Sequence, residues 1–410
     1  MSTTPSAPGT VLLVLDALPL PLTEGDRMRS YYLACAIAQA GRCVLAATGG
    51  TEAQREALLR DGPFDEILML PPRPEHGNRR RLLRLDNGHY LRSGWPAWFA
   101  LCTQALGNFI AEQHVTTAIA GKLTVAELVA ELDVPHRVLD DFDCYTLTLE
   151  REYALHRARM SVATRAAHWL ARQRYARQES SLARRFDLVT TISPADGSRL
   201  RALDRDARVE VVPNGVSDAF LEVDTDTHDA PTAGVAFWGN LAFEPNRSAV
   251  QWFIDEIYGP HLAAAGIPCY LVGGGADAWI RGLPERFERV RVTGFVDDLP
   301  GLVRQVPIMV NPMVSGSGLK NKMLEAMAMG RAVVSTAMGS EALEVRPDEH
   351  FLLADRPQQF AQAILDLHAR PQAAQAMGAR ARELVSTQYT WRRVMARWRQ
   401  VLACVEAASG

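Results

Sequence analysis

Lysine is almost absent from this sequence of 410 residues. Of the 44 basic residues only three are lysines, Lys122, Lys320 and Lys322, and the remaining 41 are arginines. Two of the three lie within three positions of each other in the stretch SGSGLKNKMLEAMAMG, residues 315–330. Because this chain uses arginine almost everywhere that a cation occurs, a retained lysine indicates a requirement for the compact ammonium group.

Other features are also missing, and each absence argues against a class of protein. The six cysteines form no Cys-x-x-Cys pair and the ten histidines show no His-x-x-x-His spacing, so we expect no zinc site. A net charge of −3 gives no indication of nucleic-acid binding. The apolar run VLLVLDALPLPL is interrupted by Asp16 and by prolines, which predicts a buried strand and not a signal peptide or membrane span. We therefore expect a cytoplasmic protein with reduced thiols.

Strand-like and helix-like segments alternate along the whole chain, which predicts an α/β protein with parallel, doubly wound sheets. The length favours two domains. In the first half, the predicted strands cover residues 11–15, 43–48, 66–70, 116–121, 137–141, 187–193 and 209–215. In the second half, they cover residues 234–239, 269–275, 290–296, 307–312 and 332–336.

An acidic segment without strand character, SDAFLEVDTDTHDAPTA, separates the two halves. We predict an N-terminal Rossmann-like domain over 1–218, a linker over 219–233 and a C-terminal Rossmann-like domain over 234–385. A final helix over 386–410 has apolar residues at helical spacing. In the N-terminal domain, an arginine-rich stretch from about 149 to 185 is predicted to be one long helical region. Ligands of such folds bind at the carboxyl ends of the strands, in a cleft between the halves.

The stretch around Lys320 predicts an anion-binding site. A strand ends at PIMVNP, the glycines of SGSG allow close approach of the backbone, and LKNKMLEAMAM follows as a helix. The N-terminus of a helix offers unpaired N–H groups and the positive end of a dipole. Between two nucleotide-binding-like halves, the expected anion is a diphosphate. Lys322 and Glu325 share one helical face, where Glu325 could accept hydrogen bonds from a ribose diol. The alternative is a surface ion pair between them, with little effect on stability.

The second half resembles the nucleotide-sugar-binding half of family 4 retaining glycosyltransferases, which have the GT-B fold. The resemblance covers most of residues 234–390, through VAFWGNLAFEPNRSAVQWF, YLVGGG, VTGFVDDLP, GSG-x-K-x-K-xx-EAMAMG and AVVSTAMGSEAL. The N-terminal half is a weaker match, through PLTEGDRMRSYYLACAIAQAG, RVLDDFD, FDLVTTIS and VVPNGV. The resemblance implies transfer of a sugar from a nucleoside diphosphate donor, with retention at the anomeric carbon and without a bound metal or other cofactor. It also implies that the final helix packs back on the N-terminal domain.

The resemblance also implies roles for individual residues. Glu325 would hold the ribose, while Lys320 and Lys322 would bind the diphosphate and act in catalysis. The main-chain amides of Gly316, Ser317, Gly318 and Leu319 would contribute to the diphosphate site. Gly239 and Asn240 would close over the phosphates, and Gly294, Phe295 and Val296 would line the base.

Two positions depart from the family pattern. The glutamate that often stands eight positions before the ribose-binding one is replaced by Ser317, as in a branch with a GSG loop. An arginine that often follows the first glycine of this half is replaced by Asn240, which leaves more of the diphosphate charge to the lysines. Two other functions therefore stay open: a GT-B nucleotide-sugar 2-epimerase, or a non-catalytic sugar-nucleotide binder.

Candidates for acceptor binding lie in the N-terminal half, at predicted strand ends. Asp141, in a cluster of aspartates, could orient or deprotonate an acceptor hydroxyl, or could only cap a turn. Gly25, Asp26 and Arg27 follow the first strand, and Lys122 follows another. The acceptor itself could be a glycan, a lipid-linked saccharide or a small natural product.

The arginine-rich region 151–185 carries nine arginines against two glutamates. With Tyr153, Trp169 and Tyr175 interleaved, it predicts a basic amphipathic surface. Such a surface could rest on the anionic inner face of a membrane or hold a phosphorylated acceptor. The alternative is a solvated helical face.

Overall fold

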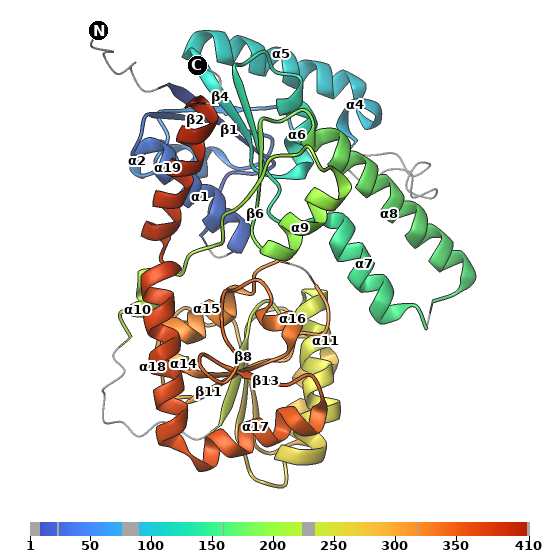
Figure 1. Ribbon diagram of the computed structural model, residues 1–410, viewed down its shortest axis with the longest axis vertical. Coiled ribbons are helices and arrows are strands. Elements are labelled where there is room, and N and C mark those ends of the chain that lie inside the picture. The colour runs from blue at the N-terminus through green and yellow to red at the C-terminus, as the bar shows by residue number, and fades with distance from the viewer. Residues whose placement is uncertain are drawn as a thin grey trace. The chain divides into compact units, whose positions relative to one another are not determined.

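The computed structural model describes residues 9–22, 24–75, 90–158, 160–223, 234–316 and 318–407. The chain divides into two compact units, which are described separately below (Figure 1). The first unit comprises Met1–Val212 and Val394–Gly410, and the second comprises Pro213–Arg393.

The first unit is built on a parallel sheet of seven strands in the order β3-β2-β1-β4-β5-β6-β7. Strand β1, inside the sheet, pairs with β2 on one side, Leu13 opposite Leu45, and with β4 on the other, Leu13 opposite Ile119. The strands are β1 (Thr10–Leu15), β2 (Arg42–Ala47), β3 (Glu66–Met69), β4 (Val115–Ala120), β5 (His136–Asp140), β6 (Leu188–Thr191) and β7 (Val209–Val211). Apolar side chains fill the inner strands because helices cover both faces, as expected for a parallel sheet.

The helices of this unit connect successive strands and cover the sheet (Figure 1). They are α1 (Gly25–Ala38), α2 (Glu52–Asp61), α4 (Leu91–Gly94), α5 (Pro96–Gln113), α6 (Leu123–Ala130), α7 (Tyr145–His156), α8 (Val162–Ala183) and α9 (Pro194–Leu203). Most of the last helix, α19 (Trp391–Ala407), belongs to this unit as well.

The second unit repeats the arrangement with six strands in the order β10-β9-β8-β11-β12-β13. All the strand pairs are parallel. The strands are β8 (Val235–Trp238), β9 (Cys269–Val272), β10 (Val290–Gly294), β11 (Ile308–Asn311), β12 (Ala332–Ser335) and β13 (Leu352–Leu353). Two parallel sheets with helical crossovers confirm the predicted α/β fold class.

The helices of the second unit include an unusual segment, the π-helix η1 (Phe253–Leu262), which continues directly from α11 (Glu244–Trp252). The other helices are α10 (Asp218–Leu221), α12 (Ala278–Arg281), α13 (Leu283–Arg286), α14 (Leu299–Val303), α15 (Asn321–Ala328), α16 (Ala337–Ser340), α17 (Pro357–Ala369) and α18 (Pro371–Gln388). No helix in the described ranges combines the length and apolar character needed to cross a bilayer.

The region from about 149 to 185 is helical, as predicted, but it consists of two helices and not one. The structure forms an antiparallel pair, α7 and α8, with a break before Ser161. The Ser161 hydroxyl accepts a hydrogen bond from the amide of Thr164 at 3.1 Å and so caps a new helix. Serine is a favoured N-cap residue because its oxygen satisfies an amide that has no partner within the helix.

The segment predicted as a linker, 219–233, contains most of α10, and its residues 224–233 lie outside the described part of the chain. The side chain of Arg382, on α18, donates to the carbonyl oxygens of Leu221 and Val223, the latter at 3.0 Å. These bonds attach the end of α10 to the second unit.

Candidate functional site

Lys322, in the first turn of α15, is a buried cation. Its side chain is only 9% exposed, and its ammonium donates a hydrogen bond to the side-chain oxygen of Asn246. Nζ also lies 4.5 Å from the centre of the Phe237 ring, an arrangement that favours the charged form. Burial, and to a smaller extent the ammonium of Lys320, lower the pKa of Lys322 to about 7, while Glu325 opposes the shift. Lys322 is therefore only partly protonated at pH 7 in the free protein, and a bound anion would favour its charged form.

Glu325 lies one turn further along α15 and is held by Trp238, the last residue of β8. The indole Nε1 of Trp238 donates to Oε2 of Glu325 at 2.6 Å. Burial raises the pKa of Glu325 above its ordinary value, while the Trp238 hydrogen bond and Lys322 oppose the rise. In the described part of the chain, Glu325 makes no ion pair and its Oε1 has no hydrogen-bond partner. The alternative of a surface ion pair between Lys322 and Glu325 is therefore wrong.

Lys320 stands immediately before α15, at the N-cap position and not in the first turn as the sequence suggested. Its side chain is 8% exposed, and Nζ donates to the carbonyl oxygen of Gly318 at 3.0 Å. Gly316 and Gly318 have φ values of 95° and 69°, in the left-handed region that favours glycine. The loop backbone thus folds around the lysine. Leu319 is buried, and Ser317 lies outside the described residues.

The backbone after β8 passes close to Lys322. A methyl group on Gly239 would lie 2.9 Å from Nδ2 of Asn246 and 3.4 Å from Cε of Lys322, and one on Gly273 would lie 1.9 Å from the carbonyl oxygen of Gly239. Asn246 joins these parts, because its Nδ2 donates to the carbonyl oxygen of Asn240 at 2.9 Å while its Oδ1 accepts from Lys322. The side chain of Asn240 itself caps the local turn, accepting from the amide of Ala242 at 3.0 Å.

The predicted base-binding segment, residues 294–296, lies next to Gly273, which follows β9. The amide of Gly273 donates to the carbonyl oxygen of Gly294 at 2.9 Å, and Gly294 has a φ of 74°. The following Phe295 is 70% exposed, whereas Val296 is half-buried. Gly294, Gly273 and Gly239 therefore form a continuous series of contacts that leads to Lys322.

Three residues of this arrangement were not predicted from the sequence: Trp238, Asn246 and Phe237. Trp238 stands at the end of a buried strand, just before Gly239. An indole N–H at that place needs a hydrogen-bond acceptor, which was the sequence signal that could have identified Trp238. Asn246 is buried although it lies in the first turn of α11, and a helical asparagine turned inward needs a partner. Phe237 carries no such signal, because its sequence environment is that of any core aromatic.

The predicted acceptor residues lie in the first unit, at the carboxyl ends of β1, β4 and β5. Lys122 forms ion pairs with Asp26, at 2.6 Å, and with Asp16, at 3.3 Å. Burial alone would lower the pKa of Lys122, but the two carboxylates outweigh it and raise that pKa. Likewise, burial alone would raise the pKa of Asp26, but Lys122 reverses the direction. Gly25 begins α1, and Arg27 contacts Glu24 at 3.2 Å.

Asp141 is fully enclosed just after β5, at 2% exposure, and its Oδ2 makes no hydrogen bond within the described residues. Burial, followed by the charges of Glu179 and Asp196, raises the pKa of Asp141 well above its ordinary value. The raised pKa favours the neutral acid, a form that can donate a hydrogen bond but cannot take up a proton. No group of three or more His, Cys, Asp or Glu side chains in the described ranges is arranged to hold a metal ion.

The chain is similar to known proteins in sequence and in structure. Residues 232–370 match a family described as "Glycosyl transferases group 1". An uncharacterized 44.6 kDa protein in the cps region of Klebsiella pneumoniae is 26% identical over 152 residues. That alignment covers 34% of this chain and 38% of the relative.

Solved structures match over almost the whole chain. Sucrose-phosphate synthase from Thermosynechococcus elongatus superposes with a TM-score of 0.68 at 17% identity, covering 98% of this chain and 100% of the other. HepE from Anabaena, in complex with UDP, superposes with a TM-score of 0.67 at 16% identity. The match covers 97% of this chain and 100% of the HepE chain. WaaG, a glycosyltransferase involved in lipopolysaccharide biosynthesis, superposes with a TM-score of 0.64 at 13% identity. The match covers 95% of this chain and 98% of the WaaG chain. At these identities the likeness shows the fold, which is GT-B. The chain thus has the GT-B fold, and its residues 232–370 are similar to group 1 glycosyltransferases.

Proposed function

We propose that this protein transfers a sugar from a nucleoside diphosphate sugar to an acceptor hydroxyl, with retention of anomeric configuration. The observation that carries the proposal is the assembly at the start of α15, where a buried lysine with a pKa of about 7 lies beside a held carboxylate and a glycine-rich loop. The match of residues 232–370 to group 1 glycosyltransferases supports it. HepE, which shares the fold, has been crystallised with UDP and with UDP-glucose.

We assign the donor contacts as follows. Oε1 of Glu325 accepts from the ribose, since Oε2 is occupied by Trp238. The ammonium groups of Lys320 and Lys322 bind the diphosphate together with the loop amides of residues 316–319. The backbone at Gly239 and Asn240 approaches the phosphates, because only a glycine at 239 leaves room beside Lys322. The segment 294–296 lines the base.

In the reaction, the bond between the anomeric carbon and the diphosphate oxygen breaks, and the acceptor oxygen bonds to that carbon on the same face. The acceptor proton passes to the departing phosphate oxygen. The negative charge that develops on the diphosphate is stabilised by Lys320, by Lys322 and by the N-terminus of α15. Lys322 is only partly protonated near pH 7 in the free protein, and a bound diphosphate would favour its charged form. We propose that no metal is required.

In the first unit, we propose that Asp141 orients the acceptor as a neutral acid, and that the Asp26–Lys122 pair and Arg27 line the acceptor site. The six cysteines are free thiols, which supports a cytoplasmic location. A location on the inner membrane face is addressed below.

The test is calorimetric binding of UDP, GDP, ADP and dTDP to the wild type and to Glu325→Ala, with and without EDTA. We expect one nucleotide to bind selectively, with no effect of EDTA, and Glu325→Ala to weaken it at least about 30-fold by loss of hydrogen bonds to a charged group. Equal binding by the folded variant would overturn the donor-site assignment.

The matching nucleotide sugar is then followed by NMR. Conversion in the absence of any acceptor would show an epimerase, and binding without turnover over an acceptor panel would show a binder. Transfer product with the donor's anomeric configuration supports the proposal.

A further inference from the structure

The α7–α8 hairpin carries a concentration of exposed apolar side chains. Figure 1 shows the two helices extending away from the sheet of their own unit. Of the nine large hydrophobic residues that are exposed in the described part of the chain, four lie on this hairpin. They are Leu155 (43% exposed), Val162 (84%), Trp169 (57%) and Leu170 (40%).

Leu155 and Val162 flank the break between the two helices, and Trp169 and Leu170 lie about two turns further along α8. Positions 162, 166 and 169 share one face of α8, because they are separated by four and three residues. A different face of α8, with His168 and Tyr175, packs on α7: the Tyr175 ring stacks on Tyr145 at 5.1 Å, and the His168 ring lies 5.5 Å from Tyr153. The apolar stripe therefore has no role in holding the two helices together.

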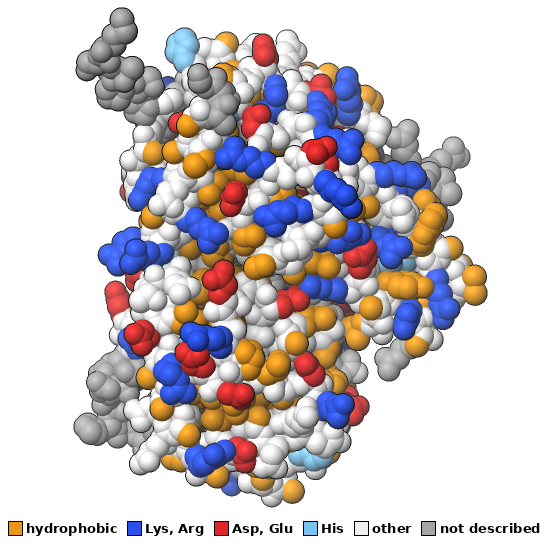
Figure 2. All heavy atoms as spheres, viewed as in Figure 1, with side chains coloured by type: hydrophobic (Ala, Val, Ile, Leu, Met, Phe, Trp, Pro, Cys, Tyr) orange, Lys and Arg blue, Asp and Glu red, His pale blue; other side chains and the backbone are white. Residues whose placement is uncertain are grey.

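Arginines border the stripe. Arg157 follows α7, while Arg165 and Arg172 lie along α8 beside Trp169. None of these three forms an ion pair with any residue that the structure describes. Figure 2 shows blue and orange side chains side by side over this part of the molecule. A free positive charge next to an exposed apolar stripe complements a surface that is both anionic and apolar.

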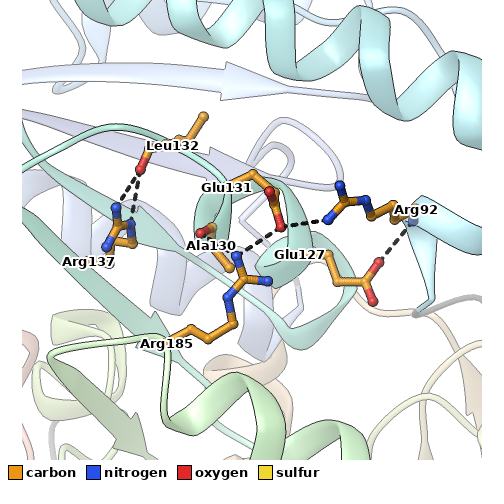
Figure 3. A network of polar contacts seen from close by, with 7 residues as sticks. All are labelled: Arg92, Glu127, Ala130, Glu131, Leu132, Arg137 and Arg185. Atoms are coloured by element: carbon orange, nitrogen blue, oxygen red, sulfur yellow. Dashed lines mark hydrogen bonds and ion pairs between the residues drawn. The ribbon is translucent and has the colours of Figure 1, made fainter.

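The base of the hairpin differs, because its arginines are used within the fold. Arg185, just after α8, donates to Oε1 of Glu131 and to the carbonyl oxygen of Ala130, both at 2.8 Å (Figure 3). The same glutamate accepts from Arg92 at 3.2 Å. Arg184 pairs with Asp204 at 2.7 Å. Arg157 and Arg165 therefore form no ion pair with a described residue close to the apolar side chains, whereas Arg184 and Arg185 at the base are paired.

We propose that the tip of the α7–α8 hairpin is a membrane-docking element that binds an anionic lipid bilayer. Val162, Trp169 and Leu155 enter the interfacial region, and Arg157, Arg165 and Arg172 contact lipid phosphates. The inference goes beyond the proposed function and does not depend on it. Apolar side chains and arginines together favour a bilayer as the partner. A purely charged ligand would bind the arginines but leave the apolar stripe exposed to water.

The test is co-sedimentation of the full chain with vesicles of phosphatidylcholine, with or without 30% phosphatidylglycerol (on the order of a cytoplasmic leaflet's anionic fraction). We expect binding only to the anionic vesicles. Trp169→Ser should weaken it about 10-fold or more through lost apolar burial. The triple change of Arg157, Arg165 and Arg172 to Gln should weaken it about 100-fold, at about fivefold for each arginine.

Matched controls exist on the same unit. Leu101 on α5 is also 57% exposed, so Leu101→Ser removes an equally exposed apolar group elsewhere. Changing the exposed Arg42, Arg205 and Arg208 to Gln alters the net charge by the same amount. Both controls should bind like the wild type. Trp169→Phe should also bind, but it should lose most of the fluorescence quenching by brominated lipids.

Three results would overturn the proposal. The first is absence of binding to anionic vesicles, and the second is equal loss in hairpin and control variants. The third is a dimer in sedimentation velocity that Trp169→Ser dissociates, which would identify a second copy of the chain as the occupant. Nucleotide binding by each variant, measured without lipid, shows separately whether the donor site is intact.

Discussion

The charge of Lys322 should respond to an anion bound beside it. With a pKa of about 7 in the free protein, this lysine is mostly neutral at pH 8, and a bound diphosphate would raise that pKa. We therefore expect proton uptake on nucleotide binding at pH 8, and an affinity that falls as the pH rises above 7, by up to about tenfold per unit.

The measurement is calorimetry at pH 8 in buffers of different ionisation enthalpy. Lys322→Gln is the control, because its residual binding should take up no proton through this site. Binding by the wild type without proton uptake would show that Lys322 does not face the phosphates.

Trp238 is expected to act as a positioning residue for Glu325. Trp238→Phe keeps the aromatic packing but removes the donor 2.6 Å from Oε2, so the pKa of Glu325 should rise further. We expect about 10-fold weaker nucleotide binding, with a larger loss at pH 6 than at pH 8, because a protonated carboxyl accepts ribose hydrogen bonds poorly. Calorimetry at both pH values measures this change.

Trp252→Phe serves as a control, since Trp252 packs edge-on against Phe360 in the core. If the loss in Trp238→Phe were equal at both pH values, Trp238 would contribute packing only.

The sequence alone pointed to Lys322 and Glu325, because lysine is rare in this chain and the two residues are three positions apart. It did not find their partners Asn246 and Trp238, which lie 76 and 87 positions away. Such contacts depend on how β8 lies beside α15. One sequence alone contains no periodic signal for that arrangement.

Among the elements, α1, β5 and α19 are joined through one buried arginine. Arg29 donates to both carboxylate oxygens of Asp140 at 2.7 Å and to the carbonyl oxygen of Val212, also at 2.7 Å. Its guanidinium also lies 5.3 Å from the Trp398 ring. Both members of the ion pair are 1% exposed.

Arg29→Met should destabilise the first unit by about 3–5 kcal/mol, because it leaves the Asp140 carboxylate buried without a cation. Urea unfolding, followed by circular dichroism, measures the change. Adding Asp140→Asn should recover part of the loss, since no charge then remains buried. Arg208→Met, an exposed change on the same unit, should have little effect; a similar loss there would contradict this explanation.

The positions of the central strands were predicted better than those of the helix break and the edge strand. The central strands were found almost to the residue, because continuous apolar runs such as VLLVL are typical of a sheet buried on both faces. The break between α7 and α8 was not predicted, since no glycine or proline marks it. The edge strand β13 was missed because two residues carry no periodicity.

At the scale of the whole molecule, the buried acids of the first unit determine how stability varies with pH. The pKa of Asp141 is raised well above its ordinary value, and that of Glu179 is raised to about 7, in both cases mainly by burial. The folded state therefore binds more protons than the unfolded state above about pH 4. This contribution to stability is fully present below about pH 4 and is lost progressively as the pH rises through 7.

Asp141→Asn should reduce this loss, so the variant should be more stable than the wild type at pH 8, by about 1.4 kcal/mol for each unit of raised pKa, and less so at pH 5. Unfolding at both pH values is the measurement. Asp61→Asn, at a surface carboxylate, should show no such difference. Equal effects at pH 5 and pH 8 would show that Asp141 is ionised in the folded protein. Transfer activity retained by Asp141→Asn would agree with an orienting role.

The scarcity of lysine has a consequence for handling the protein. Lys320 and Lys322 are less than a tenth exposed, and Lys122 is held between two carboxylates. Amine-directed cross-linkers and dyes will therefore find almost no side chain to modify on the outside of the protein. Lys322, whose pKa burial lowers to about 7, belongs to the donor site that we propose. A phosphate-bearing aldehyde, trapped by borohydride, would accordingly mark that site as an affinity label, and an added nucleotide would shield it.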